Sequence, residues 1–149
     1  MDRSENMRRI RNKNSKPELL VRRLIYAMGY RYRLHGDKLP GSPDIVFTRK
    51  KKVIFVHGCF WHLHEGCKYS RIPKSNSDYW EPKLQRNKAR DVENQNHLRE
   101  TGWEYLVIWE CQIIKIDDLL KTIKNYLESG VIEAGNHYSI RDVFEDNWN

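Results

Sequence analysis

The most restrictive feature of this chain is the segment His57–Cys67, which reads HGCFWHLHEGC and holds three histidines and two cysteines. Imidazole nitrogen and thiolate sulfur are preferred ligands of Zn²⁺, which takes four of them in structural sites. Cys59, His64 and Cys67 are close enough in sequence to supply three ligands from one loop. The alternative is that the thiols are merely buried and the histidines are ordinary surface groups.

Cys111 is the third cysteine of the chain. An odd number of cysteines argues against a disulfide framework and favours metal ligation or buried thiols. Cys111 follows a predicted strand, and a parallel or antiparallel neighbour of the strand predicted at 53–56 would bring it beside the loop. The resulting Cys₃His site would be structural, because four protein ligands leave no open position for chemistry. Catalysis is therefore expected at another metal.

Hydrophobic periodicity predicts a single α/β domain over residues 15–149, with a less certain tail beyond about 130. Ser15 and Glu18 match a helix capping box, and Lys50, Lys51 and Lys52 are expected at the solvated tip of a hairpin. Helices are predicted at about 16–28, 77–100 and 119–127, and strands at 30–35, 44–47, 53–56 and 103–109. This order predicts an α/β sandwich around a mixed sheet.

Asp44 begins one predicted strand and His57 ends the next, so a hairpin places them near one edge of the sheet. A carboxylate there suits Mg²⁺; the alternative is that Asp44 is a turn residue that hydrogen-bonds the local backbone after Pro43. His57 and His62 lie outside the zinc set and are free for proton transfer. His35 and His97 lack such surroundings and are expected to be exposed.

The formal net charge is +7, and basic residues are dense in residues 1–14, which are predicted to form a flexible arm. Such a charge favours a polyanionic partner. The chain has no apolar run long enough to cross a bilayer and no signal peptide, so a cytoplasmic protein is expected.

Taken together, these residues resemble the very short patch repair (Vsr) DNA mismatch endonucleases. The similarity runs from about Asn6 to Cys111 and is carried by Pro43-Asp44, by the string from Phe55 to His62, and by Trp109-Glu110-Cys111. The resemblance implies a restriction-endonuclease-like fold of the PD-(D/E)xK superfamily. In most of that superfamily a Glu-x-Lys pair assists the Asp. Here Phe55-Val56-His57 stands in its place, as it is replaced throughout this branch.

The resemblance also implies roles for individual residues. Asp44 and the backbone carbonyl of Val56 would bind Mg²⁺, His62 would be the general base, and His57 would support the phosphate. Glu18 matches an acidic position of the family, although its capping role alone would explain it. Zn²⁺ would be bound by Cys59, His64, Cys67 and Cys111, with one residue more than usual between His64 and Cys67.

A further set of residues would contact DNA. The resemblance assigns Phe60 and Trp61 to a wedge in the base stack and Met7 to an arm residue inserted from the minor groove. Core packing is the alternative for the two aromatics, although their place in a polar loop favours an outward orientation. Lys83, Asn87 and Asp91 share one face of the long helix. The first two would touch the mismatched bases, and Asp91 would lie near the histidines, unless this face is simply solvated.

The expected function is therefore Mg²⁺-dependent nicking of double-stranded DNA 5′ to the thymine of a T:G mismatch, which begins the repair of deaminated 5-methylcytosine. The protein is expected to act as a monomer. Two alternatives stay open on the sequence alone. One is a non-catalytic zinc-containing DNA-binding module, and the other is a restriction-type nuclease that cuts paired DNA.

Overall fold

The first described helix, α2, spans Lys16–Ala27 in a computed structural model that describes residues 14–129. The Ser15 side chain accepts a hydrogen bond from the backbone N–H of Glu18, and proline occupies the first turn, as the sequence predicted. The reciprocal half of the capping box is replaced, because the Glu18 carboxylate accepts from the N–H of Asn14 instead. Glu18 is buried, with 2% of its surface exposed.

The four strands form one mixed sheet in the order β1-β2-β3-β4. The strands are β1 (Arg33–Leu34), β2 (Ile45–Phe47), β3 (Lys52–His57) and β4 (Glu104–Trp109). The first three are antiparallel neighbours, whereas β3 and β4 are parallel. The strand predicted at 30–35 is reduced to two residues, since His35 adopts a positive φ of 51° that ends the extended run.

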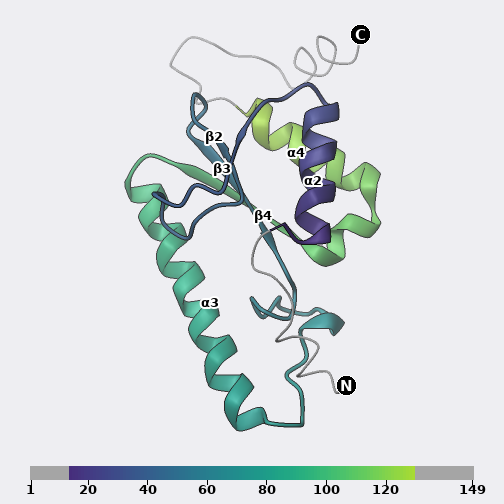
Figure 1. Cartoon of the computed structure of the whole chain (residues 1–149), viewed down its shortest axis with the longest axis vertical. Coiled ribbons are helices and arrows are strands. Elements are labelled where there is room, and N and C mark those ends of the chain that lie inside the picture. The colour runs from purple at the N-terminus through teal and green to yellow at the C-terminus, as the bar shows by residue number, and fades with distance from the viewer. Residues whose placement is uncertain (1–13, 130–149) are drawn as a thin grey trace.

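Helices cover both faces of this sheet (Figure 1). On one side α2 and α4 (Ile116–Glu128) pack their apolar faces against alternate strand residues such as Ile45, Ile54 and Ile108. On the other side α3 (Ser77–Glu100) contributes Leu98 to a second cluster with Val53. The predicted α/β sandwich is thus confirmed, and the period of two in the strands explains how one sheet faces two apolar layers.

Lys52 corrects one prediction about the hairpin tip. Lys50 and Lys51 are exposed as expected, but Lys52 is only 2% exposed. Its ammonium group donates hydrogen bonds to the backbone carbonyls of Tyr126 and Ser129 at the end of α4. The last carbonyls of a helix have no partner within the helix, so they provide acceptors that a buried lysine can use.

Within residues 14–129, no helix combines the length and the apolar composition that crossing a membrane requires. The proposed arm with Met7, and the tail after residue 129, lie outside the described residues.

Candidate functional site

The register of the two parallel strands brings the cysteines together. His57 at the end of β3 pairs with Trp109 at the end of β4. Cys59 and Cys111 each follow two residues later, so both reach the same edge of the sheet. The sequence left open whether the strands run parallel or antiparallel, and the parallel arrangement accounts for the meeting of two residues far apart in the chain.

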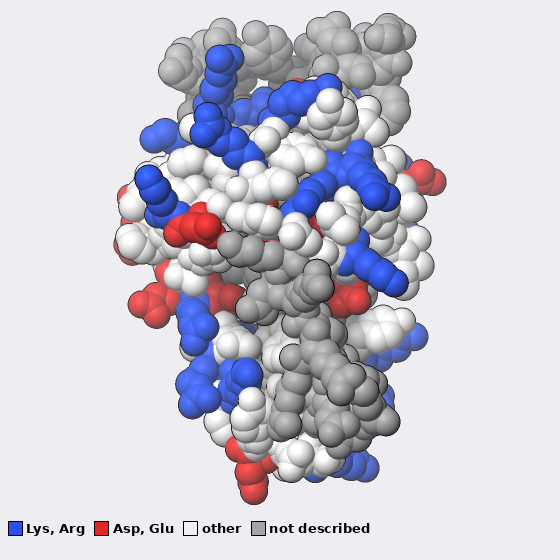
Figure 2. Space-filling model, in the orientation of Figure 1, with Lys and Arg blue, Asp and Glu red and all other residues white. Residues whose placement is uncertain are grey.

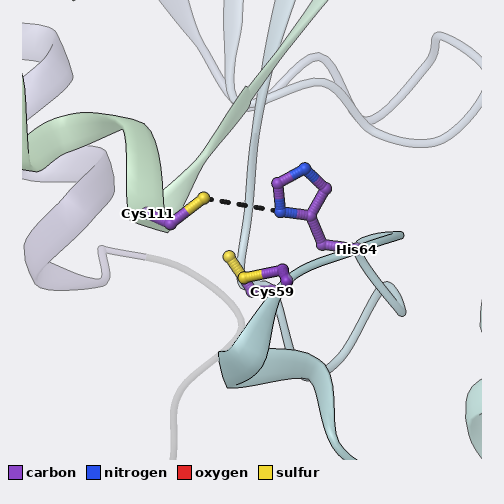
Figure 3. Close-up of side chains that lie close together, drawn as sticks. Cys59, His64 and Cys111 are labelled. Atoms are coloured by element: carbon purple, nitrogen blue, oxygen red, sulfur yellow. Dashed lines mark hydrogen bonds between the residues drawn. The ribbon is translucent and has the colours of Figure 1, made fainter.

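Cys59, His64, Cys67 and Cys111 form one cluster whose ligand atoms all lie within 4.8 Å of one another. Figure 3 shows the Cys111 thiol pointing at the His64 ring, with Sγ 3.4 Å from Nδ1. An ion about 2.0–2.3 Å from each ligand fits a group of this size. All three cysteines are free of disulfides. The predicted Cys₃His set is therefore a coherent candidate metal site.

The electrostatics of the buried thiol also fit a cation. Burial raises the pKa of Cys59 to about 12, so without a nearby positive charge this thiol holds its proton. A coordinating divalent metal reverses this preference, because it binds the thiolate directly. The ring of His64 stacks on Trp109 at 4.1 Å between centroids, which fixes the orientation of this ligand.

His62 lies only two residues before His64 but belongs to a different cluster. Leu63 between them adopts a left-handed conformation with φ of 47°, which turns the chain. The Nδ1 atom of His62 lies 2.6 Å from a carboxylate oxygen of Asp91 on α3. An ionised carboxylate only accepts hydrogen bonds, so Nδ1 carries the proton and Nε2 is left able to accept one.

His57 stacks directly on His62, with ring centroids 3.6 Å apart and planes within 4°. Burial, with a smaller contribution from His62, lowers the pKa of His57 to about 2. His57 is therefore neutral, and it can contact a phosphate as an N–H donor but not as a cation. Its buried Nδ1 atom has no hydrogen-bond partner among the described residues.

Asp44 immediately precedes β2 and lines the same cleft as these histidines. Its carboxylate accepts a hydrogen bond from the N–H of Val56 at 2.7 Å, across the sheet and not within a local turn. Burial raises the pKa of Asp44 to about 7; the Val56 N–H opposes this shift and the adjacent Glu18 carboxyl adds to it. Two neighbouring carboxyl groups in a shielded position are suited to share a divalent cation.

Glu18 is held by groups that the sequence did not predict. Its carboxylate forms an ion pair with Arg22 and lies 3.4 Å from Nε2 of His35. His35 was expected to be an exposed strand residue, which is wrong, because its side chain is half-buried. Its backbone N–H donates a hydrogen bond to the carbonyl of Asp44. The only sequence signal for it was its place at the end of the segment leading to Asp44. His97 is exposed, as predicted.

One cleft of about 1710 Å³ joins these groups. It exceeds the roughly 300–1,000 Å³ of typical small-molecule sites, so a macromolecular ligand suits it better. Its lining includes Asp44, Val56, His57 and His62, and α3 contributes Lys83, Asn87 and Asp91. Figure 2 shows Lys and Arg side chains spread over the visible face rather than gathered in one patch, so charge alone does not locate a binding site.

The two loop aromatics differ from each other. Phe60 is 4% exposed and packs edge-on against Trp80 of α3, so the expectation that it faces outward is wrong for this structure. Trp61 is half-buried and lines the cleft. The ammonium group of Lys83 lies 5.6 Å from the centre of the Trp61 ring, and the Asn87 amide donates to the Trp61 carbonyl at 3.2 Å.

Comparison with known proteins gives a consistent result. Residues 1–68 match the family described as DNA mismatch endonuclease Vsr. The type II nicking enzyme V.XorIIP of Xanthomonas oryzae pv. oryzae is 46% identical over 122 residues, which cover 82% of this chain and 89% of that protein. V.NmeAIP of Neisseria meningitidis is 43% identical, over 74% of this chain and 79% of the relative. The DNA mismatch endonuclease Vsr of Escherichia coli is 37% identical over 74% and 70%, respectively.

Proposed function

The chain belongs to the Vsr family of DNA mismatch endonucleases and is an endodeoxyribonuclease, and from this premise we propose that it nicks DNA 5′ to the thymine of a T:G mismatch in a Mg²⁺-dependent reaction. Such a nick would begin very short patch repair of deaminated 5-methylcytosine. A restriction-endonuclease-like core and a monomeric state form part of the same proposal.

One observation carries the proposal. Asp44 and the His62–Asp91 pair line the same cleft, whereas the Cys₃His cluster uses neither Asp44 nor His62. A carboxylate suited to a cation and an imidazole with one nitrogen able to accept a proton thus line one cleft, which supports a hydrolytic role. Zn²⁺ at the Cys₃His cluster would hold the loop that carries His62 and follows His57.

Asp44, the carbonyl of Val56 and the neighbouring Glu18 would hold the catalytic Mg²⁺, since oxygen ligands suit this cation. Bound there, the ion would stabilise negative charge developing on the phosphate. Nε2 of His62 would accept a proton from the attacking water while Asp91 keeps the ring oriented. The neutral His57 would donate an N–H to the phosphate. Trp61 would stack on a base beside the mismatch, Lys83 and Asn87 would contact the mismatched bases, and Met7 would enter the minor groove.

Incubation of the purified protein and Mg²⁺ with duplexes labelled on either strand tests the proposal. We expect a nick in the thymine strand of a T:G duplex and none in the T:A duplex of the same sequence. Asp44→Asn should lower the nicking rate on the order of 10³-fold, because it removes a carboxylate that would bind the metal. This factor corresponds to a rise of about 4 kcal/mol in the activation free energy. Asp37→Asn is the matched control, since this exposed carboxylate lines the same cleft.

The possible contrary results are distinct. Equal cutting of T:A and T:G duplexes would mean a nuclease that acts on paired DNA. Binding without any cutting would mean a DNA-binding module. Full activity in Asp44→Asn would reject the assignment of the metal site.

A further inference from the structure

The face of α3 that lines the cleft extends beyond the residues considered so far. Arg90 and Asn94 line the cleft together with Lys83, Asn87 and Asp91. Spacings of three and four residues place all five on one side of the helix. Arg90 precedes Asp91 in the chain and so lies next to the His62–Asp91 pair, where the phosphodiester would be cut.

Arg90 has no ion-pair partner among the residues that the structure describes, unlike the charged Asp91 beside it. Asp91 is paired with His62, and Lys83 is surrounded by aromatic rings. The guanidinium group of Arg90 is exposed and forms no ion pair or hydrogen bond with any residue between 14 and 129. An unpaired arginine in a cleft is suited to a phosphate, whose oxygens match its fork of N–H donors.

The opposite wall of the cleft offers a second cation of the same kind. Lys16 in the first turn of α2 is exposed and lines the cleft, and within the described part of the chain it too has no ion-pair partner. α2 and α3 lie on opposite sides of the sheet, so the two cations approach the cleft from different directions (Figure 1).

A backbone phosphate that enters this cleft meets carboxyl groups as well as cations. Asp37, Asp44, Asp91 and Glu110 all contribute to the lining. Their negative charge would repel DNA unless fixed cations offset it. Arg90 and Lys16 are cations of the two walls whose charge no described carboxylate already neutralises.

On the basis of the proposed function, we propose that Arg90 and Lys16 each bind a phosphate of the DNA backbone, one from each wall, and so hold the duplex over Asp44. These contacts are independent of base sequence, because phosphates carry no sequence information. They position the strand, while base recognition is left to other residues.

The number of phosphates bound is measurable through salt. For each phosphate that a cation neutralises, the slope of log affinity against log salt becomes steeper by about 0.9. Arg90→Gln and Lys16→Gln should each reduce the slope by about this amount, and weaken binding to T:G and T:A duplexes equally. Fluorescence anisotropy without added Mg²⁺ measures the affinity for each duplex. Repeating it between about 50 and 200 mM salt gives the slope.

Each variant has a matched control on its own helix. Arg86 on α3 and Arg23 on α2 are exposed but do not line the cleft. Arg86→Gln and Arg23→Gln should keep the wild-type slope. Arg90→Lys should also keep it, because the charge is retained.

An unchanged slope in Arg90→Gln or in Lys16→Gln would overturn the assignment of that residue, and so would an equal fall in its control. A loss confined to T:G duplexes would also overturn it, because it would mean a base contact. Nicking by the wild type is assayed on the same preparation. If it nicks no duplex while the slopes differ as expected, the proposed function fails and the phosphate contacts stand.

Discussion

The contact between His62 and Asp91 shows how much a single neighbour determines at the residue scale. An imidazole with no partner exchanges its proton between two nitrogens. The carboxylate at 2.6 Å fixes the proton on Nδ1 and leaves Nε2 as the acceptor. The role of His62 as a base therefore depends on a residue of another element.

Asp91→Asn tests this dependence. An asparagine amide can donate to Nδ1 and so favour the opposite tautomer, which leaves no acceptor at Nε2. We expect kcat for nicking to fall on the order of 10²-fold or more, the size typical of a lost general base, without a loss of DNA affinity. Single-turnover nicking and anisotropy measure the two effects.

Glu93→Gln is the matched control, because Glu93 is an exposed carboxylate on α3 outside the cleft. It should leave kcat unchanged. A wild-type kcat in Asp91→Asn would mean that the tautomer of His62 does not limit the reaction.

At this scale, the position of a residue could be predicted from the sequence where the residue stands at the end of a predicted strand. Asp44 and His57 were placed near each other by the expected hairpin alone. His35 and the buried Phe60 were not predicted, because their surroundings depend on a positive φ and on the distant Trp80. Neither is visible in a local pattern.

At the scale of elements, Lys52 connects the start of β3 to the end of α4. It supplies donors to the carbonyls of Tyr126 and Ser129, and its ammonium group lies 3.6 Å from the Glu104 carboxylate. The sequence KKK gave no reason to distinguish Lys52 from its neighbours. Only the alternation of β3 together with the position of α4 makes it an internal residue.

Lys52→Met should destabilise the protein, because it removes the ammonium group that donates to the carbonyls of Tyr126 and Ser129. The expected loss in the free energy of unfolding is about 1–3 kcal/mol. Lys51→Met, at an exposed position, should change it by less than about 0.5 kcal/mol. Urea denaturation followed by circular dichroism measures both, and equal stabilities would show that the bonds to α4 contribute nothing.

The longer elements were predicted closely. The segment at 77–100, which has no helix breaker except Pro82 in its first turns, is the helix Ser77–Glu100, and the apolar run at 103–109 contains β4. Both could be predicted because each is long and ends at a clear boundary. The segment at 30–35 has the alternation of a strand but forms only two paired residues, because pairing depends on what lies alongside it.

At the scale of the whole molecule, the Cys₃His cluster joins the loop after β3 to the segment after β4. The same loop carries His62, whose ring stacks on His57 at the end of β3, so loss of the metal would disturb both histidines. We therefore expect the site to support both stability and activity without taking part in the chemistry.

His64→Gln should bring bound zinc below about half an equivalent per chain and cost several kcal/mol, roughly 10 °C in Tm. Nicking should be lost with it. Metal analysis of protein purified without chelators measures the zinc content, and a thermal scan of the same protein measures Tm. The exposed His97 is the control, and His97→Gln should keep about one equivalent of zinc. Full zinc content in His64→Gln would contradict the ligand assignment.

The spacing of the loop has an evolutionary consequence. The single residue Leu63 separates a histidine of one centre from a histidine of the other, so an insertion or deletion there would disable both at once. Gly66, with φ of 68°, has no atom of residues 14–129 within 4 Å of where a side chain would begin, so the chain has room to lengthen there. Length variation among relatives should therefore be confined to the stretch between His64 and Cys67, and be absent between Cys59 and His64.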